Sequence, residues 1–467
     1  MIRELCDKVV SLAYSDLPEP LIDRARQLFL DGLAVAIAGT DERAIHLLAH
    51  HYHAYGARPD ATVLGLGFRT AAPCAAALNG AAMHVLDFEP MWLPANHAVS
   101  TTLPAVLALA ETHHTDGREI LTALVKGIEI QGWIRQAGHA AALSGEIFHP
   151  PGVVGPIGSA VAAGHLLRLD SAALTHAIGI ASSRAGSLFA NAGTMVKCTH
   201  CGHAAQAGLE AAMLAAAGFH SNPEAIEAPN GYAVAFLGQD FDVRKLLNFG
   251  SSFRILEPGY ALKMFPSQFG THFSITAGLE LSRKLSSPKQ IQSIRLTTPV
   301  MPYVNRPLPE NGLAGKFSFQ YTFCRALVDG RVSIDTFSDR QVQDPDIRDL
   351  LARVQLTMDP AIPARFEAMH VEAEVQLLDG NVLSARCDRP RGSWGSKPIG
   401  RTEHLDKVRD CLSRRLTDEM VERCIALALK IERLSASEVG ELLAIAGRLH
   451  PTDNRSDACG LPSRHLA

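Results

Sequence analysis

The chain has no long run of basic residues, and its 44 Lys and Arg are outnumbered by 48 Asp and Glu, for a net charge of −4. Nucleic-acid binding needs a basic patch, so we expect no nucleic-acid partner. The first residues carry early charge and no apolar signal core. Residues 148–167 lack charge, but three prolines and four glycines argue against a membrane span. We therefore expect a cytoplasmic protein.

The nine cysteines show no regular spacing, and an odd number in a long chain predicts reduced thiols. Cys198-x-x-Cys201, with His200 and His203, resembles half of a zinc site. Structural zinc takes four ligands, typically in two separated pairs, and no second cysteine pair is present. In a helix these four side chains would also point to different faces. We therefore expect no metal here.

The length of the chain and a change in its pattern of apolar residues predict two domains. A chain of 467 residues exceeds the size, about 250–300 residues, at which single cores usually split. Apolar residues recur at helical spacing over 22–36 and again over 120–128, after Asp116-Gly117. The stretches 155–167 and 203–217 are almost entirely small or apolar, so we expect central helices that pack closely.

The pattern changes after about residue 262. Residues 291–300 alternate as a strand does, and 371–388 reads as a hairpin whose turn is Asp379-Gly380. Residues 317–329 and 345–354 look helical, and helical periodicity returns over 404–449. The predicted fold is mainly α: a helical domain (1–262 and 402–455) with an inserted α+β lid domain (263–401). The polar tail, 456–467, is expected to be disordered.

Lys197 is the only formally charged side chain between Arg184 and Glu210. An ammonium among small and apolar residues is costly to bury unless an anion pairs with it. That partner is either distant in the sequence or a bound ligand, which makes Lys197 a pointer to an anion site. The alternative is a lysine at a helix end whose ammonium reaches water.

Other polar residues stand at junctions between loops and apolar segments. His97 precedes a helix that begins near residues 100–104, where free backbone N–H groups and the helix dipole favour an anion. His149 likewise enters a helix of small residues. Asp87, His272 and Tyr321 follow or lie within apolar runs. Taken singly, each of these five is more often structural than catalytic.

As an ordered set, these segments resemble the 2-methylcitrate dehydratase (MmgE/PrpD) family. The resemblance spans about residues 10–450. It rests on His97 with 103–111, on 127–129, on His149-Pro150, on 194–197 with 202–205, on 317–321 and on the hairpin turn at 379–380.

The resemblance implies a helical domain, an α+β lid and an active-site cleft between them, in a homodimer that uses neither a metal nor an organic cofactor. Members include 2-methylcitrate dehydratase, cis-aconitate decarboxylase and iminodisuccinate epimerase. Carried over residue by residue, the expected catalytic residues are Asp87, His97, His149, Lys197, His272 and Tyr321.

One segment departs from the family pattern. Where the family commonly has an Asp-Phe-Asp-Asp-Thr run, this chain has Asp87-Phe88-Glu89-Pro90-Met91. Met91 replaces a polar threonine, so that end of the pocket should have a different shape. This puts 2-methylcitrate and cis-aconitate in doubt as the substrate.

The resemblance implies a lyase, a dehydratase or decarboxylase, that moves a proton at a carbon next to a carboxylate of a small di- or tricarboxylic acid. We expect Lys197, His97 and Met91 to contact the substrate, with Lys197 holding a carboxylate. A neutral His97 or His149 would be the base.

In this scheme His272 or Tyr321 would donate a proton, and Asp87 would orient a histidine. Two alternatives stay open: an epimerase or isomerase of a dicarboxylate, and a non-catalytic carboxylate-binding protein on the same scaffold.

Overall fold

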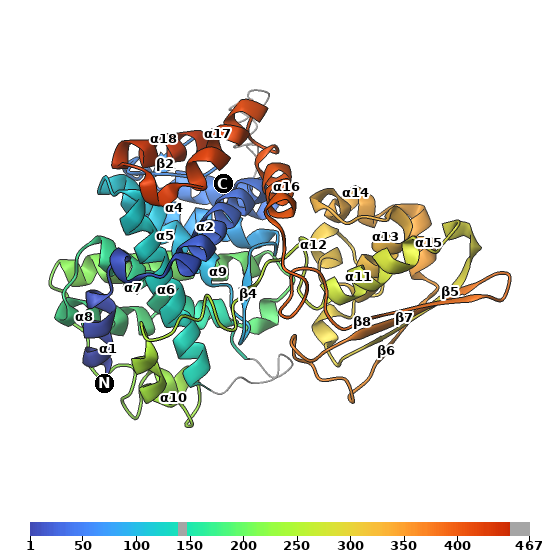
Figure 1. The fold of residues 1–467 in the computed structure, drawn as a ribbon, viewed down its shortest axis with the longest axis horizontal. Coiled ribbons are helices and arrows are strands. Elements are labelled where there is room, and N and C mark those ends of the chain that lie inside the picture. Colours follow the sequence, from blue (N-terminus) through green and yellow to red (C-terminus); the bar gives the residue numbers. More distant parts are fainter. Residues whose placement is uncertain (139–146, 449–467) are drawn as a thin grey trace, which may run out of the picture.

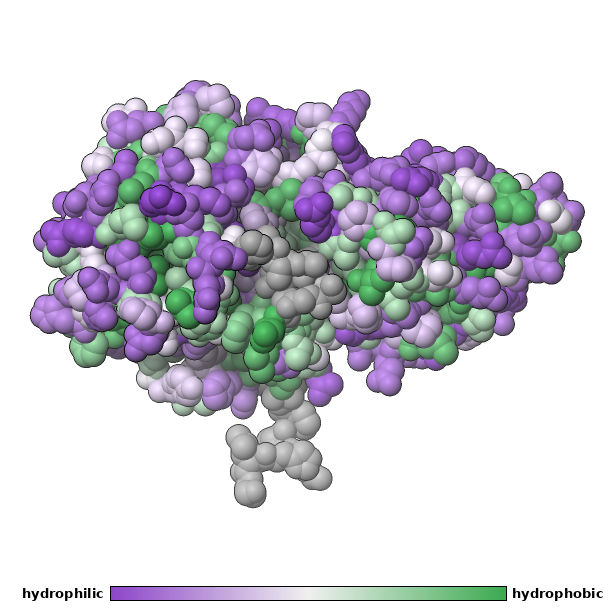
Figure 2. Space-filling model, turned by 90° about the horizontal axis from the view of Figure 1, so that it is seen from below, coloured by the Kyte–Doolittle hydropathy of each residue, from purple (hydrophilic) through white to green (hydrophobic). Residues whose placement is uncertain are grey.

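The computed structural model describes residues 1–138 and 147–448, so the tail predicted to be disordered lies outside the described residues. The described part of the chain is mainly helical, as predicted, with one four-stranded sheet and two pairs of two-residue strands. Figure 1 shows a large helical body beside a smaller body that carries the sheet. On the face seen in Figure 2, hydrophilic side chains predominate on both bodies, with apolar ones interspersed.

The helical body confirms the predicted helices. The helix α2 (Glu19–Gly39) has Pro20 in its first turn and ends at Gly39. Asp116 caps α6 (Gly117–Ala137) by accepting hydrogen bonds from two backbone N–H groups of its first turn. The other helices of this body are α1 (Ile2–Ser11), α3 (Arg43–His53), α4 (Ala72–Val85), α5 (Ala98–Thr112), α7 (Pro150–Leu166), α8 (Ser171–Ser182), α9 (Val196–Ala216), α10 (Tyr232–Phe236), α16 (Arg401–Leu412), α17 (Asp418–Ala428) and α18 (Ala436–Ala446).

Small residues bring α7 and α9 into close contact, as the sequence predicts, and α4 packs closely on α9 as well. A Cβ on Gly202 of α9 would lie 2.2 Å from the carbonyl oxygen of Ala77 in α4. A Cβ on Gly208 would lie 2.2 Å from the carbonyl oxygen of Pro156 in α7. Both glycines are therefore required by backbone approach. This packing holds the N-terminal ends of the helices in fixed relative positions.

The smaller body is built around a sheet of order β6-β5-β7-β8. The predicted hairpin is confirmed: β7 (Val371–Leu377) pairs with β8 (Val382–Cys387), and alternate residues of β7 are buried. The strand β5 (Ile291–Thr298) pairs antiparallel with β7 and parallel with β6 (Val354–Met358). The helices here are α11 (Thr271–Ser282), α12 (Gly312–Gly315), α13 (Phe319–Asp329), α14 (Asp339–Val342) and α15 (Pro345–Leu351).

The end of the segment expected to be helical over 345–354 is corrected by the structure. The helix α15 stops at Leu351, and Val354 begins β6. Parallel pairing with β5, more than fifty residues away in the chain, determines this boundary. Local periodicity does not contain that information.

Each body has its own hydrophobic core. One core combines residues from Ile2 to Ile255 with residues from Val408 to Ala446, so the C-terminal helices pack on the first body. The second core runs from Ala261 to Cys387 and also takes in Met91. At the boundary, β3 (Met91–Trp92) pairs with β4 (Tyr260–Ala261). Among the described helices, none has both the length and the apolar character needed to cross a membrane.

Candidate active site

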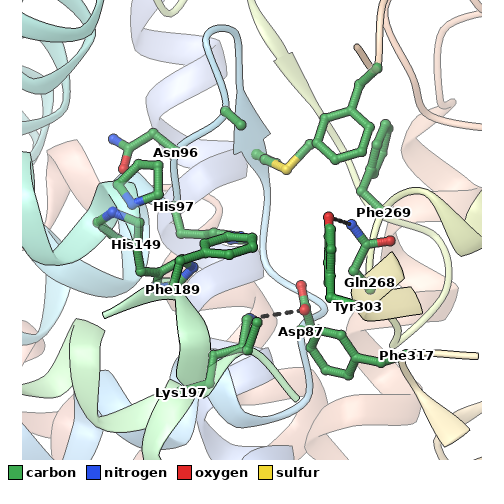
Figure 3. A pocket seen from close by; sticks show the side chains of 16 residues that line it. Asp87, Asn96, His97, His149, Phe189, Lys197, Gln268, Phe269, Tyr303 and Phe317 are labelled. Carbon is green, nitrogen blue, oxygen red and sulfur yellow. Dashed lines mark hydrogen bonds and ion pairs between the residues drawn. The ribbon is translucent and has the colours of Figure 1, made fainter. Parts of the chain in front are cut away.

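A pocket lies between the two bodies and is lined by side chains from both. Figure 3 shows Lys197 and Asp87 along one edge, His97 and His149 on one wall, and Tyr303 with Gln268 on the wall opposite. The lining residues are Asp87, Met91, Ala95, Asn96, His97, His149, Pro150, Pro151, Phe189, Ala192, Lys197, Gln268, Phe269, Tyr303, Phe317 and Phe366.

Three helices of the first body begin at this pocket. His97 is the N-cap residue of α5, His149 is that of α7, and Lys197 lies in the first turn of α9. The rings of His97 and His149 are 6.1 Å apart between centroids. Helix N-termini present unpaired N–H groups and the positive end of the dipole, so their convergence favours an anion.

Lys197 is buried, with 8% of its surface exposed, which rules out the alternative that its ammonium reaches water. Its Nζ donates to Oδ2 of Asp87 at 2.9 Å. The other oxygen of Asp87 accepts from Nζ of Lys263, which is fully buried. The counter-charge that the local sequence lacks is thus Asp87, 110 residues away.

Asp87 stays ionised in this setting. Burial alone would raise its pKa, but the ammonium groups of Lys197 and Lys263 hold the pKa well below its ordinary value. Burial in turn lowers the pKa of Lys263, an effect that the nearby carboxylate of Asp87 opposes. Asp87 also has a positive φ of 51°, a conformation that Asp adopts more readily than most residues.

A second buried network lies behind the pocket. Nδ1 of His84 contacts Oε1 of Glu89, and Nδ1 of His97 lies 3.0 Å from the same oxygen. Nε2 of His84 lies 2.8 Å from Nζ of Lys197. Burial and the charge of Lys197 lower the pKa of His84 to about 3, so its imidazole is neutral. It therefore donates through Nδ1 to Glu89 and accepts from Lys197 through Nε2.

His149 is also neutral. Burial and the charge of Lys197 together lower its pKa well below the ordinary value. Its Nδ1 lies 3.1 Å from Nδ1 of His200. The imidazole of His149, neutral and buried at the N-terminus of α7, can accept a proton from a bound acid.

On the wall opposite, Gln268 precedes α11 and Tyr303 lies in the short helix Pro302–Val304. Nε2 of Gln268 donates to the phenol oxygen of Tyr303 at 2.9 Å. Burial and the nearby charge of Asp87 raise the pKa of Tyr303, which keeps the phenol protonated. With the amide already donating to its oxygen, the Tyr303 O–H is available as a donor towards the pocket.

Five of the residues singled out from the sequence line this pocket: Asp87, Met91, His97, His149 and Lys197. Two do not. His272 packs against the rings of Phe265 and Phe269, at 5.2 and 5.0 Å between centroids.

Tyr321 is fully buried in the second core, and its hydroxyl donates to the carbonyl oxygen of Thr336 at 2.5 Å. Gln268 and Tyr303 occupy the pocket wall in place of His272 and Tyr321.

Sequence reasoning missed His84, Glu89, Lys263, Gln268 and Tyr303. Glu89 lies in the run already noted as a departure from the family pattern, which was the one local signal available. Gln268 lies four residues before His272, on the loop rather than in the helix. No local pattern distinguishes Tyr303 from the other tyrosines.

The cysteine and histidine side chains of α9 do not converge. His203 is exposed, His200 contacts His149, and Cys198 donates to the carbonyl oxygen of Met195. Cys201 lies instead near His84 and Glu89. The four residues therefore form no shared site.

A different set has the spacing of metal ligands. Ligand atoms of His84, His97 and His149 lie within 4.8 Å of one another. However, both ring nitrogens of His84 already have partners, Glu89 on one side and the ammonium of Lys197 on the other. The arrangement fits a network of hydrogen bonds and charges better than a metal centre.

Two domains of one known family match most of the chain. Residues 3–244 match the MmgE/PrpD N-terminal domain, and residues 265–433 match the MmgE/PrpD C-terminal domain. The chain is 32% identical to cis-aconitate decarboxylase of Mus musculus over 441 residues, which cover 92% of this chain and 90% of that protein. It is 32% identical to the enzyme of the same name from Homo sapiens over 440 residues, covering 92% and 91%.

A more distant relative is 2-methylcitrate dehydratase of Cupriavidus necator, 27% identical over 408 residues, which cover 79% of this chain and 81% of that protein. The decarboxylases and the dehydratase are all lyases. Both halves of the chain match, in order and over most of its length. The chain therefore belongs to the MmgE/PrpD family.

Proposed function

We propose that this protein is a lyase that removes water or carbon dioxide from a small carboxylic acid by proton transfer at a carbon next to a carboxylate. One observation carries the proposal: His149 and Tyr303 lie on opposite walls of a pocket that three helix N-termini make favourable to anions, and the Phe189 ring packs against both at 6.0 and 5.2 Å between centroids. The names of the relatives support the same class of reaction.

In this mechanism a substrate carboxylate lies at the N-termini of α5, α7 and α9, where the Lys197 ammonium donates to it. As the carbon next to it loses a proton or a carboxyl group, negative charge spreads onto the carboxylate. Lys197 and the helix N–H groups stabilise that charge. Neither contribution requires a cofactor.

We assign the proton transfers to His149 and Tyr303, which lie on opposite walls of the pocket. For dehydration, His149 takes the proton from carbon, and the C–O bond breaks as Tyr303 gives its proton to the departing hydroxyl. For decarboxylation, the C–C bond breaks with its electron pair left on the substrate, and Tyr303 protonates the resulting carbanion. His97, held by Glu89, is the second polar group on the His149 wall.

The same geometry supports an epimerase as a second candidate. Epimerisation needs a base on one face of the carbon and an acid on the other, and His149 and Tyr303 lie on opposite walls. The names of the relatives favour a lyase. The cytoplasmic location and the homodimer belong to this proposal too. The described cysteines, all free and buried, support a reducing compartment.

Incubation with a panel of di- and tricarboxylic acids in heavy water, followed by proton NMR, tests the proposal. We expect an alkene signal from dehydration, or loss of carbon dioxide with deuterium at the former carboxyl-bearing carbon. Deuterium exchange without net conversion would establish the epimerase instead. Neither exchange nor conversion with any acid would leave a carboxylate-binding protein and overturn both enzymatic readings.

The pH profile tests the role of His149. A base works only when it is deprotonated, and an ordinary imidazole with a pKa of about 6.5 would lose roughly tenfold activity by about pH 5.5. Because the pKa of His149 is lowered well below that value, we expect kcat/KM to stay level from pH 8 to pH 6 and fall only at lower pH. An acidic limb centred near pH 6.5 would exclude His149 as the base.

A further inference from the structure

Arg306 is a cation of the second body, on the loop between Tyr303 and α13. Pro307 follows it and disfavours a helical backbone at position 306. The carbonyl oxygen of Arg306 accepts from the hydroxyl of Ser318 at 2.6 Å, and Ser318 is in turn the N-cap residue of α13. The second body therefore sets the position from which the Arg306 side chain extends.

The guanidinium of Arg306 bridges the two bodies. Its terminal nitrogens donate to the carbonyl oxygens of Ala192 and Gly193 at 3.2 and 3.3 Å, and its Nε donates to that of Tyr303 at 3.3 Å. A Cβ on Gly193 would lie 2.3 Å from one of the terminal nitrogens, so this glycine leaves the space that the cation occupies. Ala192 and Tyr303 line the pocket, so the guanidinium borders it.

This cation has no carboxylate partner among residues 1–138 and 147–448. Each of the acceptors just named is a neutral carbonyl oxygen. Burial lowers the pKa of the Arg306 guanidinium, and no described carboxylate opposes that shift. A guanidinium carries five N–H groups, so two of them, one on each terminal nitrogen, have no acceptor in the described part of the chain. A partly buried cation in this state favours an anionic ligand.

Two cations lie near the same aromatic side chain of the pocket. Phe317 lines the pocket, and the centroid of its ring is 5.4 Å from Cζ of Arg306 and 5.6 Å from Nζ of Lys197. Lys197 shares the carboxylate of Asp87 with Lys263, whereas Arg306 brings a positive charge that no described acid offsets. An acid with two carboxylates can therefore place one at each cation.

We propose that Arg306 binds a second carboxylate of the substrate, so that the acid spans the two bodies, with its reacting end at Lys197 and its remote carboxylate at Arg306. The proposal rests on the function proposed above and assigns a specificity-determining residue to it. Lys197 is the anchor next to the reacting carbon, and Arg306 adds affinity for the far end of the acid. A monocarboxylic acid of the same length lacks this contact.

Binding of unreactive saturated acids tests this inference independently of turnover. Succinate and butyrate are matched in carbon number, as are glutarate and valerate, but only the first acid of each pair has a carboxylate at both ends. Titration calorimetry at constant ionic strength should show that, in at least one pair, the diacid binds about 10–100-fold more tightly, as expected for hydrogen bonds to a charged group. Equal affinities within both pairs would overturn the inference.

Arg306→Gln should bind the preferred diacid about 10–100-fold more weakly and leave the monoacids unchanged. Arg306→Lys keeps the charge and should restore part of the preference. If Arg306 only holds the bodies together, Arg306→Gln would weaken diacids and monoacids alike, and that result would overturn the inference. If Arg306→Gln does not fold, the acid pairs on the unaltered protein still decide the matter.

Arg295→Gln is the matched control. Arg295 is exposed on β5 of the same body and pairs at the surface with Glu374. This control should leave the affinity for every acid unchanged.

The outcomes separate this inference from the proposed function. A diacid preference that Arg306→Gln abolishes, without turnover of any acid, would support the inference and overturn the lyase. Where an acid is turned over, Arg306→Gln should raise KM far more than it lowers kcat, because a remote carboxylate is held alike in the ground state and the transition state. Turnover with an unchanged KM in Arg306→Gln would overturn the inference and leave the lyase intact.

Discussion

Lys197→Met is expected to lower kcat/KM by about 10²–10³-fold while the fold stays intact. The variant lacks a hydrogen-bond donor to the negative charge that develops on the substrate carboxylate. Removing one such donor from an active site typically lowers the rate by about 10²–10³-fold. The fold survives because Asp87 keeps Lys263 as its partner. Methionine is similar in length and apolar, so it fills the space among the aromatic side chains.

Steady-state kinetics on the acid identified by NMR, together with circular dichroism, would measure both effects. Lys284→Met is a matched control, because Lys284 is exposed and pairs only at the surface with Glu280. It should be active and stable. Near-normal kinetics for Lys197→Met would contradict its assignment as the carboxylate anchor.

Asp87→Asn is expected to destabilise the protein by about 3–5 kcal/mol, because it leaves the two buried ammonium groups of Lys197 and Lys263 without their counter-charge. Asparagine tolerates the positive φ at this position, so the substitution adds no backbone strain to the measured loss of stability. Thermal unfolding should show a melting temperature lower by roughly 3–5 °C. The exposed turn variant Asp379→Asn should melt like the unaltered protein.

The loss of stability in Asp87→Asn should also depend on pH. The pKa of Asp87 is lower in the folded state than in the unfolded chain, so its ionisation stabilises the fold above the ordinary carboxylate pKa. That contribution is lost as pH falls towards the lowered folded-state value. Asp87→Asn should therefore differ most from the unaltered protein near neutral pH and least in acid. A difference that is constant with pH would contradict the charge-pair explanation.

Much of the fold could be predicted from local patterns. Helical periodicity over 22–36 located α2 to within three residues at each end, and alternation around Asp379-Gly380 located the hairpin. These features depend on neighbours within a few residues. The strand β6 was missed because it exists through parallel pairing with a distant strand.

The candidate site was predictable only in part. His97 and His149 stand out because each precedes a helix, and Lys197 stands out because it is the only charged side chain between Arg184 and Glu210. Tyr303 and Gln268 carry no such mark. They reach the pocket because the second core positions their loops against the first body.

By itself, the sequence determined the central helices, the hairpin, the family resemblance and the isolation of Lys197 from any nearby acid. Those properties depend on residue order over short distances, or on an ordered set of motifs. The tertiary structure decided that Asp87 neutralises Lys197, that Lys263 shares the same carboxylate, and that Tyr303 lies on the wall opposite His149. Electrostatic energies depend on distance in space and on burial, and neither can be inferred from the order of residues alone.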